Sequence, residues 1–354
     1  MVFPISFLSS FSLLSLVLFS PSAYGQLVPA IFIFGDSVMD VGNNNHLPTL
    51  IKANFRPYGR DFFNHTPTGR FCNGKIVTDL IAETLGFSSY QPAYLSKEAS
   101  GSNLLIGANF ASAASGYYEP TAISNLAIPL SKQLDNYKEY QGKVVEITGS
   151  DNATSMFSGG IYLVSAGSSD FVQNYYINPL LNTAYTPDQF SNILVQNFVK
   201  FIEGLYALGA RKIGVTSLPP LGCLPTAITL FGSGSQECVE RLNRDALSFN
   251  RKLNDTSDQL VKNKLSNLTL VVFDIYQPLY ELITKPAEHG FTETRRGCCG
   301  TGLVETSILC NPVSSVITCK NASEYVFWDG FHPSEAANQV LAIDLLTAGL
   351  PLIS

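Results

Sequence analysis

The sequence has few charged residues and no cluster of basic ones. Lys, Arg, Asp and Glu make up 14% of the 354 residues, and the formal net charge is −6. An ordinary soluble domain has roughly 25% charged residues. An acidic balance without basic blocks argues against nucleic acid as the main partner, because the phosphate backbone is held by Lys and Arg. Apolar residues make up 45%, which excludes a disordered chain and permits a large packed core.

Long apolar runs are absent beyond the first 25 residues. No later run approaches the roughly 18 residues of a membrane helix, and Asp344 interrupts the apolar C-terminus, which argues against a lipid-anchor tail. The first 25 residues contain no Asp, Glu, Lys or Arg, and their apolar stretch from Ile5 to Phe19 is too short to span a bilayer. Residues 23–25, Ala-Tyr-Gly, place small side chains at the two positions that a signal peptidase reads. We therefore expect residues 1–25 to be a secretory signal cleaved before Gln26, with a membrane anchor as the alternative, and the protein to be secreted.

Acceptor sequences for N-glycosylation agree with export but support it only mildly, since they arise by chance a few times per chain. None of the Asn-x-Ser/Thr sequences has Pro in the middle, and they lie at Asn64, Asn152, Asn254, Asn267 and Asn321. We expect these asparagines to be glycosylated in the secreted protein.

The 7 cysteines predict disulfides and one unpaired thiol in an oxidising compartment. Cys223 and Cys238 flank a loop rich in Gly and Ser, and we expect them to pair, since closing a loop of about 15 residues contributes roughly 3 kcal/mol to stability. Cys72 is then expected to stay unpaired. Two further bridges of undecided connectivity would join Cys298, Cys299, Cys310 and Cys319. A metal cluster is the alternative for these four, but adjacent cysteines without nearby histidine fit zinc poorly, so we expect no metal site.

Short apolar runs alternate with helical patterns along the chain. The expected strands are Ala30–Phe34, Ile161–Ser165, Lys212–Ser217 and Leu268–Ile275. The expected helices are Lys75–Leu85, Asp188–Leu208, Cys238–Leu265 and Ser334–Thr347. This alternation predicts a parallel sheet covered on both faces, an α/β/α sandwich of three layers. The chain shows no repeat, charge block or long linker, so we expect residues 26–354 to form one domain.

Catalytic groups of such a sheet are expected beyond the carboxyl ends of the strands. The first of these ends is followed by Gly35, Asp36 and Ser37. A glycine after a buried strand permits a sharp turn, which would present Ser37 to a crevice. A strand-ending turn without catalytic function is the alternative, because such residues are common in loops.

A serine nucleophile needs a base, and the sequence has only 4 histidines. Only His332 follows an Asp by three positions, in a segment from Trp328 to Pro333. That spacing lets the Asp329 carboxylate reach Nδ1 and orient the ring while Nε2 faces the serine. The alternative is a capping Asp beside a buried histidine without catalytic function. The other histidines lie among polar loop residues, where we expect bystanders: His46, His65 and His289.

A series of short motifs follows from one end of the chain to the other. They are Phe34-Gly35-Asp36-Ser37 with Asp40-Val41-Gly42-Asn43-Asn44-Asn45, Thr68-Gly69-Arg70-Phe71-Cys72-Asn73-Gly74, Gly107-Ala108-Asn109-Phe110-Ala111-Ser112, Gly167-Ser168-Ser169-Asp170, Leu218-Pro219-Pro220-Leu221-Gly222-Cys223, Cys298-Cys299-Gly300 and Phe327-Trp328-Asp329-Gly330-Phe331-His332-Pro333. In this order they resemble the plant GDSL esterase/lipase family, a branch of the SGNH hydrolases. The resemblance implies a flavodoxin-like α/β/α hydrolase that acts on carboxylic esters, with Ser37 as nucleophile and Asp329 and His332 completing the triad.

The family's oxyanion hole combines the backbone N–H of the serine, a second backbone N–H from the glycine block and an Asn side chain. Here Ser169 stands where the family has Asn, and Ala113-Ala114 stand where the family often has Gly-Gly. We assign the three donors to Ser37, Ala114 and Ser169, with Gly116 as the alternative to Ala114. A hydroxyl can still donate one hydrogen bond, so slower turnover is compatible with this departure, whereas loss of activity does not follow from it.

The sequence leaves three functions open. The first is a secreted carboxylesterase or lipase acting on lipid or cell-wall esters in the extracellular space, without cofactor or metal. The second is an acyltransferase that uses the same triad. The third is a glycosylated cell-wall protein that binds esters or carbohydrate with little or no turnover, which the change at Ser169 alone favours. The sequence does not define acyl length or oligomeric state.

Overall fold

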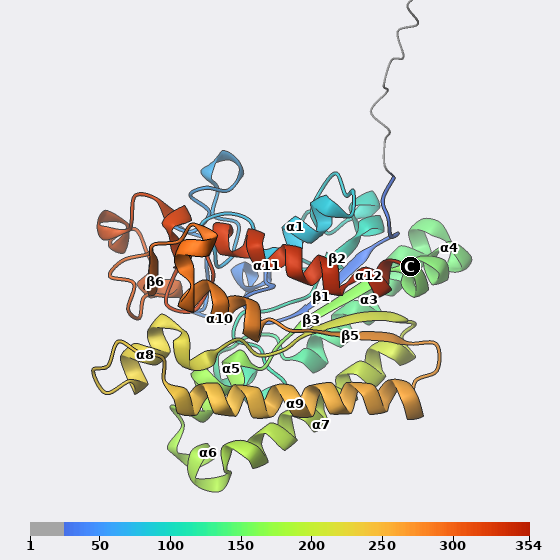
Figure 1. The fold of residues 1–354 in the computed structure, drawn as a ribbon. Helices are drawn as coiled ribbons and strands as arrows, with labels where there is room; N and C mark the ends of the chain where they lie inside the picture. Colours follow the sequence, from blue (N-terminus) through green and yellow to red (C-terminus); the bar gives the residue numbers. More distant parts are fainter. Residues whose placement is uncertain (1–24) are drawn as a thin grey trace, which may run out of the picture.

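The computed structural model describes residues 25–354, and the predicted secretory signal therefore lies, but for Gly25, outside the described residues. At its centre is a 5-stranded parallel sheet with the strand order β2-β1-β3-β4-β5 (Figure 1). The strands are β1 (Ile31–Gly35), β2 (Gly107–Asn109), β3 (Ile161–Ser165), β4 (Lys212–Thr216) and β5 (Thr269–Phe273). The four predicted strands are thus confirmed, with small differences at their ends, and β2 is an additional strand that the sequence reading missed.

Alternate side chains of the central strands enter two different cores. Ile31 of β1 is aligned with Ile161 of β3, and both belong to one buried cluster. The next pair, Phe32 and Tyr162, belongs to the other cluster. Successive side chains of a strand point to opposite faces of the sheet, so both faces of these strands are buried. This explains why the strands read as continuous apolar runs instead of alternating patterns.

One face of the sheet is covered by α1 (Val77–Thr84), α11 (Glu335–Ala348) and the short α12 (Leu350–Ile353). Leu345 of α11 packs in the same cluster as Ile31 of β1. In Figure 1, α1 and α11 lie on the side of the sheet opposite to α7 and α9.

The other face is covered by α3 (Leu130–Thr148), α7 (Pro187–Ala207) and α9 (Glu240–Asn263). Phe198 of α7 packs in the same cluster as Phe32 of β1. The expected α/β/α sandwich is therefore confirmed. The remaining helices are α2 (Glu119–Ser124), α4 (Ser150–Gly159), α5 (Ser168–Asp170), α6 (Pro179–Ala184), α8 (Pro225–Phe231) and α10 (Tyr276–Thr284), and a separate 2-stranded parallel sheet joins β6 (Glu293–Gly297) and β7 (Tyr325–Phe327).

The four predicted helices are confirmed as α1, α7, α9 and α11, and their exact ends are set by capping groups. Thr186 accepts the N–H of Gln189 on its side-chain oxygen, while the Gln189 side chain accepts the N–H of Thr186. This reciprocal pair satisfies donors that the first turn of α7 leaves without partners. Gly209, with a φ of 100°, follows the end of the same helix.

Three disulfides are present and confirm the expected use of the cysteines. Cys223 pairs with Cys238, and the connectivity that the sequence left undecided is Cys298–Cys319 and Cys299–Cys310. Cys72 is unpaired and buried.

Across residues 25–354, no helix combines the length and the apolar character that crossing a membrane requires.

Candidate active site

Ser37 lies just beyond the carboxyl end of β1, in a turn that requires Gly35. The φ of Gly35 is 131°, and a side chain there would collide with the backbone carbonyl of Ser165 on β3. The N–H of Asp36 donates to that same carbonyl over 2.9 Å, so the carboxyl end of β3 fixes the turn that carries the serine.

His332 lies in the loop between β7 and α11, and this loop is fixed at both sides. The Trp328 N–H donates to the His332 carbonyl over 2.7 Å, and Ser334 caps α11 by accepting the N–H of Ala337. The Nε2 atom of His332 lies 2.7 Å from the Ser37 Oγ, although the two residues are 295 positions apart. The structure therefore brings the serine and the histidine into hydrogen-bond contact.

The Asp329 carboxylate holds the other side of the imidazole. Its Oδ1 and Oδ2 lie 2.8 and 2.9 Å from His332 Nδ1. Oδ1 also accepts the backbone N–H groups of Phe331 and His332, each over 2.9 Å. Asp329 is fully buried, where a carboxylate is stable only if hydrogen bonds replace its water.

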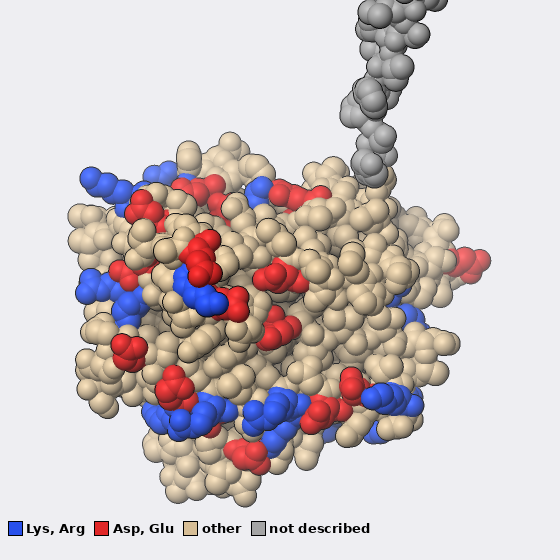
Figure 2. All heavy atoms as spheres, in the orientation of Figure 1, with Lys and Arg blue, Asp and Glu red and all other residues tan. Residues whose placement is uncertain are grey.

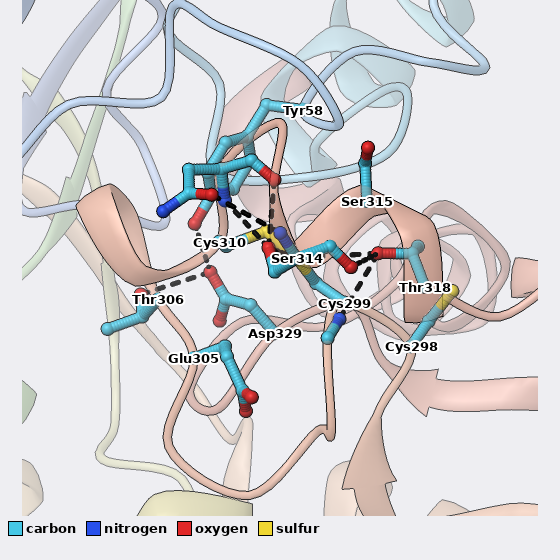
Figure 3. Close-up of a disulfide and its surroundings, with 12 residues drawn as sticks. Tyr58, Cys298, Cys299, Glu305, Thr306, Cys310, Ser314, Ser315, Thr318 and Asp329 are labelled. Carbon is cyan, nitrogen blue, oxygen red and sulfur yellow. Dashed lines mark hydrogen bonds between the residues drawn. A yellow bond between two sulfur atoms is a disulfide. The ribbon is translucent and has the colours of Figure 1, made fainter.

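Two further donors to Asp329 were not predicted from the sequence. The Tyr58 hydroxyl donates to Oδ2 over 2.7 Å, and the Thr306 hydroxyl lies 3.1 Å from the same oxygen (Figure 3). Burial, together with the Asp329 charge, raises the pKa of Tyr58 well above its usual value, so the hydroxyl keeps its proton and remains a donor. The Ser307 N–H in turn donates to the Tyr58 oxygen over 2.7 Å. No local spacing connects these residues with Asp329, so no sequence signal could have identified them.

The three expected oxyanion donors do not share one environment. The Ser37 N–H donates to no acceptor in the described chain, and the Ser169 hydroxyl, which lines the cavity beside Ser37, likewise makes no hydrogen bond within residues 25–354. Ala114 is buried with a φ of 65°, a conformation that favours glycine and explains why the resembling family often has Gly there. Neither Ala114 nor Gly116 lines that cavity, and Gly116 instead lies against the carboxylate of Asp170.

A cavity of about 90 Å³ opens at the Ser37–His332 pair. Ser37, His332, Asp36 and Ser169 supply polar groups, and most of the remaining lining is apolar. Among the residues described, no Lys or Arg lines it, and Asp36 is its only acidic residue. Burial raises the pKa of Asp36 to about 7, so this carboxyl titrates near neutral pH.

Other candidate residues lie away from the cavity. His46, His65 and His289 are exposed, and none of them lines it. Asp40 accepts the N–H groups of Gly42 and Ala113 and so joins the first motif to the glycine block.

Within residues 25–354, no three His, Cys, Asp or Glu side chains are grouped so that they could hold a metal. Lys and Arg alternate with Asp and Glu over the face seen in Figure 2, with no field of one sign.

A serine, a histidine and an aspartate in one hydrogen-bonded series beside an apolar cavity form the arrangement of a serine hydrolase. Comparison with known proteins agrees with this class. The family described as "GDSL-like Lipase/Acylhydrolase" matches residues 31–345. Two proteins of Arabidopsis thaliana are similar over most of their length. The chain is 66% identical to GDSL esterase/lipase At5g22810 over 331 residues, 93% of this chain and 91% of the relative. It is 60% identical to GDSL esterase/lipase APG over 349 residues, 98% of each.

The chain therefore belongs to the GDSL-like lipase/acylhydrolase family, and with it to the carboxylic-ester hydrolases. This agrees with the resemblance of its sequence motifs.

Proposed function

We propose that Ser37 attacks carboxylic esters and that the reaction passes through an acyl-enzyme. The observation that carries this proposal is the 2.7 Å separation of Ser37 Oγ and His332 Nε2, with Asp329 on the opposite ring nitrogen. A nucleophile, a base and an orienting carboxylate in this order are what acyl transfer by serine requires.

In the first half of the reaction, His332 takes the proton of the Ser37 hydroxyl while the oxygen attacks the ester carbonyl carbon. Asp329 stays ionised and stabilises the imidazolium that forms. His332 then gives the proton to the leaving alcohol oxygen, and the C–O bond of the ester breaks. In the second half, His332 takes a proton from water, the hydroxide attacks the acyl-enzyme, and the acid leaves while Ser37 regains its proton.

The oxyanion of both tetrahedral intermediates is held by the Ser37 N–H, the Ser169 hydroxyl and the Ala114 N–H, with Gly116 as the alternative backbone donor. Within residues 25–354 the Ser37 N–H and the Ser169 hydroxyl make no other hydrogen bond, which supports the first two assignments. Each well-aimed donor contributes about 3 to 4 kcal/mol to stabilising the transition state in comparable hydrolases.

The protein acts outside the cell after removal of residues 1–25, in the extracellular space or cell wall. Disulfides form and persist in oxidising compartments, and the three in this chain support secretion. The five acceptor asparagines are all exposed, which supports their glycosylation: Asn64, Asn152, Asn254, Asn267 and Asn321. The family match from residue 31 to 345 supports residues 26–354 as one domain.

The test is the hydrolysis of chromogenic esters of several acyl lengths by the secreted protein and its Ser37→Ala variant. We expect the variant to lose at least about a thousandfold in kcat. Ser168→Ala is the matched control, because Ser168 lines the same cavity and has no proposed chemistry. We expect it to keep kcat within about threefold.

Two outcomes would contradict the proposal. If the wild type were no faster than Ser37→Ala at any acyl length, the protein would bind esters without turning them over. If an added alcohol acceptor received the acyl group in preference to water, the enzyme would be an acyltransferase that uses the same triad.

A further inference from the structure

The cavity at Ser37 extends away from the triad along one face of the sheet. Its far part is lined by apolar side chains of α1, α10 and α11 and of the residue before α10: Val77, Ile275, Leu279, Leu341 and Leu345. The polar groups of the triad are thus confined to one end. Asn338 is the polar exception on α11, and its amide is held by donating to the Lys75 carbonyl over 3.2 Å.

A second, smaller cavity of about 20 Å³ lies farther along the same face. It is lined only by apolar side chains and one glycine, among them Ile81, Leu163, Phe273 and Leu352. Leu345 lines both cavities and is the only residue that does so within the described chain. Its side chain is 4% exposed and packs in the core between α11 and the sheet. The Leu345 side chain therefore borders both cavities.

We propose that the first cavity holds the acyl chain of the ester and that Leu345 determines the longest chain it accepts. The inference rests on the proposed ester hydrolysis at Ser37. With the carbonyl carbon at Ser37 Oγ, an uncharged apolar chain can extend toward Leu341 and Leu345, where it meets no charged side chain of the described residues. Each methylene that moves from water into such a site strengthens binding by about threefold to fourfold. The substrate class is an ester of an apolar acyl chain, with the alcohol on the open side.

Leu345 acts as a specificity-determining residue because its side chain lines both cavities. Shortening it to Ala leaves a space that the surrounding core fills only partly, and this space would join the cavities. Enlarging it to Phe would fill space in the first cavity. The two substitutions should therefore change the preferred acyl length in opposite directions.

The experiment measures kcat/KM for p-nitrophenyl esters with acyl chains of increasing length, on the wild type, Leu345→Ala and Leu345→Phe. We expect the wild-type kcat/KM to rise by about threefold to fourfold per added methylene and then to level off or fall. The maximum should move to acids longer by about two carbons or more in Leu345→Ala, and to shorter acids in Leu345→Phe. Leu205→Ala is the matched control, because Leu205 is equally buried but lies on α7 at the other face of the sheet. It should leave the maximum where it is.

A milder substitution keeps the test decisive if Leu345→Ala does not fold. Leu345→Val removes one carbon and should move the maximum in the same direction by a smaller step, while Leu345→Met, which nearly conserves volume, should leave it unchanged. An identical acyl optimum in the wild type and in every folded Leu345 variant would overturn the proposal.

Binding without catalysis separates this proposal from the proposed function. The Ser37→Ala variant should bind free fatty acids with the same dependence on chain length as the wild-type kcat/KM, and the added Leu345→Ala change should extend that dependence. If this affinity series appears but no ester is hydrolysed by the wild type, the chemistry at Ser37 is wrong and the acyl cavity stands. If esters are hydrolysed and the affinity series is flat, the acyl cavity is wrong.

Discussion

Replacing Tyr58 by Phe removes a hydroxyl that donates to the carboxylate of the proposed triad. This hydroxyl donates to Asp329 Oδ2 over 2.7 Å and accepts the Ser307 N–H over 2.7 Å. A hydrogen bond to a charged group contributes about 1.5 to 3 kcal/mol, and a buried N–H left without an acceptor costs about 1 to 3 kcal/mol. We therefore expect the free energy of unfolding to fall by roughly 2.5 to 6 kcal/mol, measured by urea unfolding.

The effect on catalysis should be smaller and confined to kcat. Asp329 keeps the Thr306 hydroxyl and two backbone N–H donors, so His332 remains near its place. We expect kcat for a short-chain chromogenic ester to fall by about tenfold, which corresponds to about 1.4 kcal/mol of transition-state stabilisation. KM should stay within about twofold, because Tyr58 does not line the cavity.

Tyr140→Phe separates this positioning effect from simple loss of stability. Tyr140 is equally buried, and its hydroxyl donates to the Leu104 carbonyl over 2.6 Å in the core between the sheet and α3. It should lower the free energy of unfolding and leave kcat unchanged. Equal kcat values for the folded Tyr58→Phe and Tyr140→Phe variants would refute a positioning function for Tyr58.

The remaining predictions address three separate features. Ser169→Ala should lower kcat about tenfold to a hundredfold, whereas Ser169→Asn should retain or raise kcat. An unchanged kcat in the alanine variant would show that this hydroxyl does not stabilise the oxyanion. Burial raises the pKa of Asp36 from 3.8 to about 7, so the folded protein keeps the carboxyl proton up to a higher pH than the unfolded chain does. The contribution of Asp36 to the free energy of unfolding therefore falls as pH rises from about 4 to about 7. Asp36→Asn should therefore gain up to about 3 kcal/mol relative to the wild type between pH 4.5 and 7.5 in urea unfolding, and a constant difference would contradict this linkage. Replacing Cys223 and Cys238 together by Ser should lower the free energy of unfolding by about 3 kcal/mol and leave kcat intact, with the activity of the folded variant as the check.

The sequence by itself determined the features that depend on neighbours along the chain. Short apolar runs located four of the five sheet strands, and helical periodicity located four of the helices that cover the sheet, α1, α7, α9 and α11. Helix α3, which also covers the sheet, was not predicted. The three-residue spacing of Asp329 and His332 indicated their contact, and the separation of Cys223 and Cys238 indicated their disulfide. The order of the motifs indicated the family that the comparisons show.

Only the tertiary structure decided which distant segments meet. Strand β2 has 3 residues, too few for a periodic pattern, and exists because it pairs with β1. The partners of Cys298 and Cys299 depend on how the chain folds between them and residue 319. Tyr58 reaches Asp329 across 271 positions, and Leu345 acquires its place between two cavities only when α11 packs on the sheet. Such contacts follow from the packing of whole layers, and no local pattern of residues encodes them.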